Sequence, residues 1–194
     1  NSGFPPHPHA NMEIITYVRD GAVSHRDSLG NRGRIAAGDV QVMSAGTGIK
    51  HSEFNLEPQT TRLFQIWIKP KADGGAPAWG TKPFPKSDRA GRFIVLASGF
   101  ETDGEALPIR AEARVLGAVL NRHQAVTYDT EDDRFLYLVP STGLVNVNGV
   151  RVEARDGAAI SSLRQVTITA LHDSEVVLVA VSYTHLRAHE TGRN

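Results

Sequence analysis

The sequence is a series of short runs of Val, Ile, Thr, Tyr and Phe, interrupted by Gly, Asp, Asn and Pro about every 8 to 12 residues. Signals for helices are scarce. This spacing of strands and turns is typical of β-sandwiches and β-barrels. Apolar residues make up 40% and charged residues 22% of the 194 residues, as in ordinary packed proteins. We therefore predict an all-β protein with enough chain for one large domain or two small ones.

The clearest strand signals lie in the first 70 residues. The stretch MEIITYVRDGAVSHRD predicts two strands that form a hairpin around a turn at Asp20 and Gly21. DSLGNRG predicts a second turn, and the Gly-Asp pair of IAAGDVQVMS predicts a third. TTRLFQIWIKP alternates between apolar and polar residues and stops at Pro70.

The middle of the chain changes character. Residues 73–90 are rich in Pro, Gly and Lys and have no periodicity, so we expect a linker there. A second strand-rich region follows, in which ARVLGAVL, FLYLVPS, QVTITAL and VVLVAVS are predicted strands. ARDGAAIS in this region echoes IAAGDVQVMS, which hints at an internal duplication. We expect one domain at residues 1–72 and a second at residues 91–181.

The two ends of the chain differ from its body. Residues 182–194, SYTHLRAHETGRN, do not continue the pattern and are expected to be a non-native or disordered tail. His185 and His189 would share a helix face there, but no third ligand accompanies them, so we expect no metal site in the tail. The chain begins with Asn1 and enters patterned sequence almost at once, so we expect that part of the first domain is missing.

Charge and cysteine content narrow the possible functions. The 21 Lys and Arg balance the 21 Asp and Glu, so no basic excess is available to displace counterions from phosphates and we expect no nucleic-acid partner. No apolar run approaches the roughly 18 to 20 residues of a membrane helix, so we expect no membrane partner. The absence of cysteine excludes disulfides and thiolate ligands and fits a cytoplasmic location.

Two residue pairs carry the candidate chemistry. His7 and His9 in FPPHPHANM are two residues apart, so both imidazoles point to one side of an extended segment, a geometry that Pro8 favours. His51 and Glu53 in KHSEFN repeat this spacing. Two such strands can enclose one divalent metal ion with three nitrogens and one carboxylate, and a six-coordinate ion would keep two positions open.

The other histidines of the body have plainer interpretations. A single histidine is more often a surface residue than a ligand. His25, in the strand-like SHRDS, is expected to be exposed or hydrogen-bonded. His123 and His172 lie in predicted loops without a partner nearby, so we expect them to be solvated.

Several segments together resemble known motifs. HPHANMEIITYVRDG resembles the first cupin motif and GDVQVMSAGTGIKHSEFN resembles the second. In many cupins the glutamate of the first motif, here Glu13, is the fourth ligand, which makes it an alternative to Glu53. More narrowly, FPPHPHANMEIITYV, HRDSLGNRG, GDVQVMSAGTGIKHSEFN and FQIWIKP resemble the pirin family, close to its bacterial quercetinase-like branch. The resemblance spans residues 3–181 and is most specific over residues 3–70.

The resemblance implies two cupin (jelly-roll) β-barrels, the first truncated at its N-terminus, with a metal ion in the first barrel alone. It implies His7, His9, His51 and Glu53 as the metal ligands. Glu13 would then orient a ligand histidine instead of binding the ion. The sequence agrees in one respect, because the predicted strands of the second half contain neither an HxH nor an HxE pattern.

The resemblance also implies a metal-dependent dioxygenase of the quercetin 2,3-dioxygenase type, which cleaves flavonols with O2. The expected cofactor is one divalent ion, Fe(II) first, with Ni, Mn, Cu, Co or Zn as alternatives. Glu53 is the expected catalytic residue and would accept the proton of the flavonol hydroxyl. Met43, Phe54 and Ile15 are candidate pocket walls, although core packing is the plainer role for each of them. We expect a monomer.

A second interpretation belongs to another class of function. Some pirins are described as regulatory proteins that sense a metal or the redox state and bind a protein partner. The motifs do not separate the two functions, because a metal ion with open positions serves both.

Overall fold

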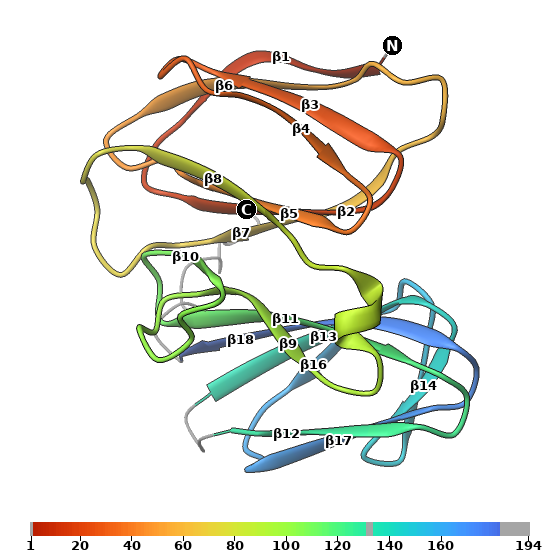
Figure 1. Cartoon of the computed structure of the whole chain (residues 1–194). Helices are drawn as coiled ribbons and strands as arrows, with labels where there is room; N and C mark the ends of the chain where they lie inside the picture. The colour runs from red at the N-terminus through yellow and green to blue at the C-terminus, as the bar shows by residue number, and fades with distance from the viewer. Residues whose placement is uncertain (1, 131–133, 183–194) are drawn as a thin grey trace, which may run out of the picture. The chain divides into compact units, whose positions relative to one another are not determined.

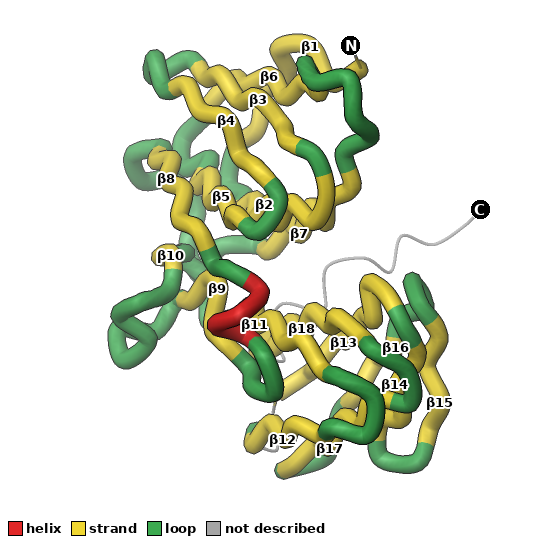
Figure 2. The backbone as a smooth tube through the Cα atoms, turned by 45° about the vertical axis from the view of Figure 1, so that its right-hand side comes forward, coloured by secondary structure: helices red, strands yellow, loops and turns green. Residues whose placement is uncertain are grey.

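The computed structural model describes residues 2–130 and 134–182, whose regular secondary structure is almost entirely β-strand (Figure 1). The chain divides into two compact units, residues 1–85 with 97–111 and residues 86–96 with 112–194. The prediction of an all-β fold is confirmed, and Figure 2 shows one short helical turn among the strands. Among the described residues, no helical segment has the length and hydropathy that a transmembrane helix requires.

The first unit consists of two four-stranded antiparallel sheets. One sheet has the order β1-β6-β3-β4 and contains β1 (Ser2–His9), β6 (Ile49–Asn55), β3 (Ala22–Asp27) and β4 (Arg32–Ala36). The other has the order β7-β2-β5-β8 and contains β7 (Arg62–Ile68), β2 (Glu13–Asp20), β5 (Asp39–Ser44) and β8 (Ala78–Pro83).

The turn at Asp20 and Gly21 joins two strands as predicted, but the predicted hairpin pairing is wrong. β2 pairs with β5 and β7, whereas β3 pairs with β4 and β6 in the other sheet. β2 is a central strand with a partner on each side, so it has no free edge for β3. The chain crosses between the sheets here, and Val18 and Val23 then pack in one apolar cluster.

Residues 73–90, expected to form a linker, contain regular structure instead. β8 pairs with β5, and a 3-10 helix covers Lys86–Arg89. The prolines and glycines concealed this strand, because β8 lies at a sheet edge and ends at Pro83, where a missing N–H is tolerated. Trp79 anchors the strand by packing against both apolar clusters of the first unit.

The second unit also contains two sheets. Its larger sheet includes β9 (Ile94–Ser98), β11 (Ala113–Leu120), β18 (Ser174–Ser182), β13 (Arg134–Thr142) and β16 (Ala158–Ile160), in that order. Its smaller sheet has the order β12 (Ala125–Asp129), β17 (Gln165–Ala170), β14 (Leu144–Val147) and β15 (Val150–Glu153). β9 runs from the second unit into the first, where its last residues pair with β10 (Leu107–Pro108).

Of the tail predicted at residues 182–194, the structure describes Ser182 alone. β18 extends to Ser182, so this residue belongs to a strand and not to the expected tail. His185 and His189 lie outside the described residues.

The interiors of the two units differ in chemistry. The second unit has one continuous apolar cluster that includes Leu116, Leu138 and Ile168. The first unit has two smaller clusters, around Ile14 and around Val18, and also buries polar side chains on β2, β3, β5 and β6. The second unit buries Arg89 and Glu175, which pair with each other at 3.2 Å. Buried polar groups cost free energy unless they are paired or bind a ligand, so the buried histidines and carboxylates of the first unit indicate a candidate site.

Candidate metal centre

The two strands that carry the predicted ligands are direct neighbours. β1 pairs antiparallel with β6, and His7 lies opposite His51 in the register. β1 is an edge strand, which explains how it tolerates Pro5, Pro6 and Pro8, because an edge strand forms ladder hydrogen bonds on one side only. Cross-strand partners point to the same face, so this register brings the two imidazoles together.

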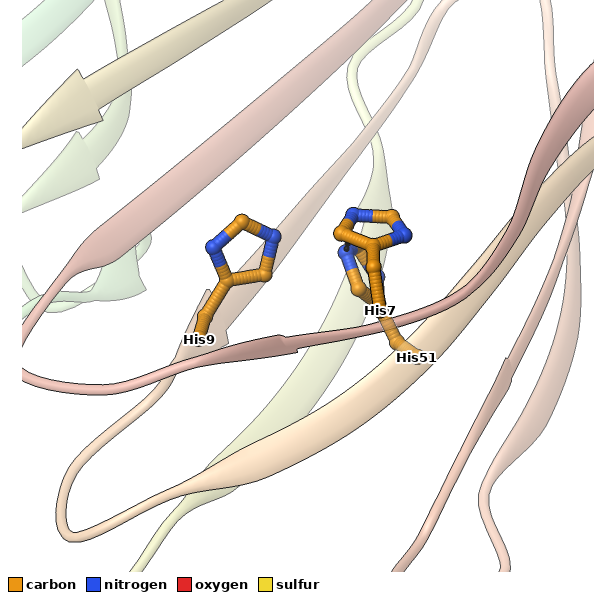
Figure 3. Close-up of side chains that lie close together, drawn as sticks. All are labelled: His7, His9 and His51. Carbon is orange, nitrogen blue, oxygen red and sulfur yellow. Dashed lines mark hydrogen bonds between the residues drawn. The ribbon is translucent and has the colours of Figure 1, made fainter.

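Three histidines converge on one face of these two strands (Figure 3). One ring nitrogen from each of His7, His9 and His51 lies within 4.8 Å of the other two. The Nε2 atoms of His7 and His51 are 3.0 Å apart. Nδ1 of His7 is 2.8 Å from the backbone oxygen of Pro5, which can only accept, so Nδ1 carries the proton and Nε2 presents a lone pair.

The donor set fits a divalent metal ion. The separation of 3.0 Å between the two Nε2 atoms matches that of neighbouring ligands on an ion with metal–nitrogen bonds of about 2.1 Å. Nε2 of His9 is buried and has no hydrogen-bond partner among the described residues. An unpaired buried nitrogen costs free energy, and an ion shared by the three rings would offset that cost.

The surroundings keep the rings of His51 and His9 in the form that binds metal. Burial, followed by the neighbouring His7, His25 and His9, lowers the pKa of His51 from its ordinary value to about 3. Burial and the nearby His7 also lower the pKa of His9. Neutral imidazole is the species that ligates a metal, so at neutral pH these rings need not lose a proton first.

Glu53 is buried on β6, two residues after His51, and its carboxylate accepts hydrogen bonds from side chains of the other sheet. Its Oε1 accepts from Nε2 of Gln41 on β5 at 2.7 Å, and its Oε2 accepts from Nε2 of Gln65 on β7 at 2.8 Å. The structure groups the Glu53 carboxylate with His25 and His51, whose ligand atoms lie within 4.8 Å, and not with His7 and His9.

Two other sequence candidates have defined partners. Glu13 is buried and accepts a hydrogen bond of 2.6 Å from Oγ of Ser44, so its partner among the described residues is not a ligand histidine. His25 is fully buried, which makes the surface interpretation wrong and leaves the hydrogen-bonded one confirmed, since its Nε2 lies 3.1 Å from Oδ2 of Asp27.

The remaining histidines of the body, His123 and His172, are exposed, as predicted.

A cavity of about 420 Å³ lies beside Glu53. Its wall has apolar and polar members, among them Phe4, Val23, Leu63, Asn55, Thr61 and Gln65. The predicted pocket walls are not part of it: Met43 and Ile15 are fully buried, and Phe54 does not line this cavity. All three predicted walls lie on strands next to the site, but their side chains do not face this cavity.

Sequence patterns missed the residues that surround Glu53. Gln41 and Gln65 stand in apolar runs, DVQVMS and LFQIWI, where a lone glutamine is the only signal that a buried polar partner exists. The local sequence does not reveal that this partner lies on a different strand, because the two sheets must first fold over each other.

The fold and the histidine cluster define a double β-barrel protein of the cupin type with a candidate metal site in its first barrel. The Pirin family model matches residues 1–68, and the model for the quercetinase C-terminal cupin domain matches residues 95–181. A pirin-like protein of Caulobacter vibrioides is 66% identical over 179 residues, which cover 92% of this chain and 77% of the relative. This chain belongs to the pirin family.

A sequence match and a structural match from Escherichia coli extend the comparison. A protein of strain K12 named quercetin 2,3-dioxygenase is 37% identical over 179 residues, which cover 91% of this chain and 75% of the relative. The crystal structure of the bacterial pirin YhhW in complex with nickel(II) has a TM-score of 0.84 at 34% identity, and the match covers 93% of this chain and 76% of that one. The prediction of two cupin barrels of the pirin type is therefore confirmed.

Proposed function

We propose that this chain is a metal-dependent dioxygenase that cleaves flavonols such as quercetin with O2. The observation that carries the proposal is the convergence of ring nitrogens of His7, His9 and His51 within 4.8 Å of one another. The cavity is linked to this cluster through Glu53, which lines it and has a carboxylate oxygen within 4.8 Å of a ring nitrogen of His51. The Escherichia coli relative named quercetin 2,3-dioxygenase supports the proposed activity, and the nickel(II) complex of YhhW supports the metal site.

The proposed ligands are His7, His9, His51 and Glu53, around one divalent ion, with Fe(II) as the first choice and Ni, Mn, Cu, Co or Zn as alternatives. Imidazole and carboxylate together suit these first-row ions, and their availability in the cell selects among them. Glu53 would join the set by giving one oxygen to the ion while the other keeps its glutamine partner.

The residues of the site have distinct roles in this reaction. A bound divalent ion supplies Lewis acidity that lowers the pKa of the flavonol 3-hydroxyl. Glu53 accepts the hydroxyl proton on a lone pair that Gln41 and Gln65 leave free. Phe4 and Leu63 pack against the flat rings and exclude water. Both atoms of O2 enter the organic product, the two ring bonds to C3 of the heterocycle break, and C3 leaves with its own oxygen as carbon monoxide.

The test is a turnover assay with quercetin. The protein is loaded with Fe(II) without air, quercetin is added, air is admitted, and the flavonol absorbance and released carbon monoxide are followed. We expect turnover by the wild type and a loss of about 10² to 10⁴ in rate for Glu53→Gln, because the base is removed. His172→Gln, which changes an exposed histidine of the second unit, is the matched control and should keep the wild-type rate.

Metal-loaded wild type that consumes no quercetin would reject the flavonol assignment. Binding of a protein partner that requires the metal, together with no turnover, would favour a metal-sensing regulatory role instead.

A further inference from the structure

His25 has one defined tautomer. Its side chain is fully buried on β3, and its ring stacks on Trp79 with 13° between the planes and 5.2 Å between the centroids. Nε2 lies 3.1 Å from Oδ2 of Asp27. Asp27 also accepts hydrogen bonds from the backbone N–H groups of Leu29 and Asn31, at 2.9 and 3.0 Å.

These contacts make Asp27 an acceptor. Burial acts to raise the pKa of Asp27, but hydrogen bonds from Asn31, His25 and Leu29 outweigh it and lower that pKa below its ordinary value. An ionised carboxylate has no proton to give, so Nε2 of His25 must be the donor. In the neutral ring the lone pair is then on Nδ1.

A neighbouring ring carries a second buried nitrogen without a partner. Nδ1 of His25 and Nδ1 of His51 are both buried, and neither has a hydrogen-bond partner among the described residues. The two rings lie 5.4 Å apart between centroids with 50° between their planes, and one ring nitrogen of each lies within 4.8 Å of the other.

The two nitrogens are chemically complementary. His51 directs its Nε2 toward His7, so a metal ligated there would leave the proton of a neutral His51 ring on Nδ1. The ring with the buried donor, His51, and the ring with the buried acceptor, His25, are then 5.4 Å apart between centroids. A small rotation of the His51 ring, or one bridging water, would satisfy both.

We propose that His25, held by Asp27, is a positioning residue that accepts the Nδ1–H of His51 and so fixes the tautomer and orientation in which His51 binds the metal. The inference rests on the proposed metal centre and adds two residues that neither the histidine motif nor the cluster of three includes. Histidine ligands commonly depend on such a hydrogen bond at their other nitrogen, and its loss costs about 10- to 100-fold in metal affinity.

Two substitutions of His25 separate the proposed role from general packing. Gln can keep a donor near the Nε2 position, toward Asp27, but has no acceptor at the Nδ1 position. Asn has the reverse property, because its carboxamide oxygen lies near the Nδ1 position. Both remove the ring that stacks on Trp79, so each is the packing control for the other.

The measurement is a Co(II) titration with a competing chelator, read from the visible ligand-field bands. We expect His25→Gln to weaken Co(II) binding about 10- to 100-fold and to change the bands, and His25→Asn to restore most of the affinity. Equal affinity in wild type and His25→Gln would overturn the role of His25 while leaving the metal centre intact. A wild type that binds no Co(II) would overturn the metal centre, and this inference with it.

A measurement on the wild type alone covers the case in which the variants do not fold. In Zn(II)-loaded protein, ¹⁵N NMR of the imidazoles should show His25 protonated on Nε2 and His51 protonated on Nδ1. A His25 ring protonated on Nδ1 would contradict the proposal.

Discussion

At the residue scale, the carboxylate of Glu53 is held by a chain of oriented amides. Gln41 and Gln65 each donate one hydrogen bond to it. The side-chain oxygen of each glutamine also accepts a hydrogen bond. Nε1 of Trp79 donates to Gln41 at 2.8 Å, and Nε1 of Trp67 donates to Gln65 at 3.0 Å. An indole N–H can only donate, so each tryptophan fixes its glutamine with the NH₂ group toward Glu53.

This chain predicts the effect of replacing the carboxylate with an amide. Glu53→Gln would leave one NH₂ group facing an NH₂ group of Gln41 or Gln65, so a buried donor would lose its acceptor. We expect the free energy of unfolding of the metal-free protein to fall by about 1 to 3 kcal/mol, measured by urea denaturation. Glu101→Gln, at an exposed position of the same unit, is the control. Equal losses in the two variants would argue against the chain.

The buried histidines predict how stability depends on pH. The pKa of His51 is about 3 in the folded chain and near its ordinary value in the unfolded chain, so the unfolded chain binds the proton more readily. Below pH 6.5, the ordinary pKa of histidine, protonation of His51 therefore favours the unfolded chain. We expect the metal-free protein to be most stable above this pH and to lose stability as the pH falls toward 3. His51→Phe should show a weaker dependence in the same denaturation series, and an unchanged slope would contradict the assignment.

At the element scale, the sequence predicted most strands but not how they pair. Strands such as β2 and β11 are visible as apolar runs bounded by turn residues, because burial in a sheet selects those side chains. The pairing of β2 depends on β5 and β7, which lie far along the chain, and no local signal specifies it. β8 was hidden for the opposite reason, since its edge position permits residues that usually indicate loops.

The candidate site shows the same division. His7, His9, His51 and Glu53 could be selected because a period of two puts each pair on one face of a strand. Sequence spacing could not show that the Glu53 carboxylate groups with His25 and His51 and not with His7 and His9. That proximity depends on how β3 pairs with β6.

The loop that leads into β6 predicts a backbone effect. Gly46 has a φ of 52°, and a Cβ there would collide with the backbone oxygen of Gly75. We expect Gly46→Ala to lower the free energy of unfolding by about 1 to 3 kcal/mol and to weaken metal binding, because the loop sets the start of the strand that carries His51. Gly104→Ala, where a Cβ meets nothing within 4 Å, should leave both measurements close to wild type. Matching results for the two variants would contradict this account.

At the scale of the whole molecule, the candidate metal ligands and the largest apolar cluster described lie in different units. The groups of His, Asp and Glu that could hold an ion, within the described residues, lie in the first unit. The second unit has an apolar cluster that includes Leu138, and its buried charged residues Arg89 and Glu175 pair with each other at 3.2 Å. The candidate metal site therefore lies in the first unit, and the larger apolar cluster lies in the second.

This division predicts that a core mutation in the second unit changes stability without changing the metal site. Leu138 is fully buried in the apolar cluster, so Leu138→Ala should lower the free energy of unfolding by about 2 to 5 kcal/mol. The number of metal ions per folded chain should stay at the wild-type value, measured by elemental analysis. A loss of metal from folded Leu138→Ala would contradict the division.

The most direct test of the central claim is the metal content of the loaded protein and of its His9→Ala and His51→Ala variants, measured by equilibrium dialysis against one divalent ion and followed by elemental analysis. The convergence of His7, His9 and His51 predicts one ion per chain in the wild type and strongly reduced binding in both variants. Full occupancy in the folded variants, or none in the wild type, would contradict it.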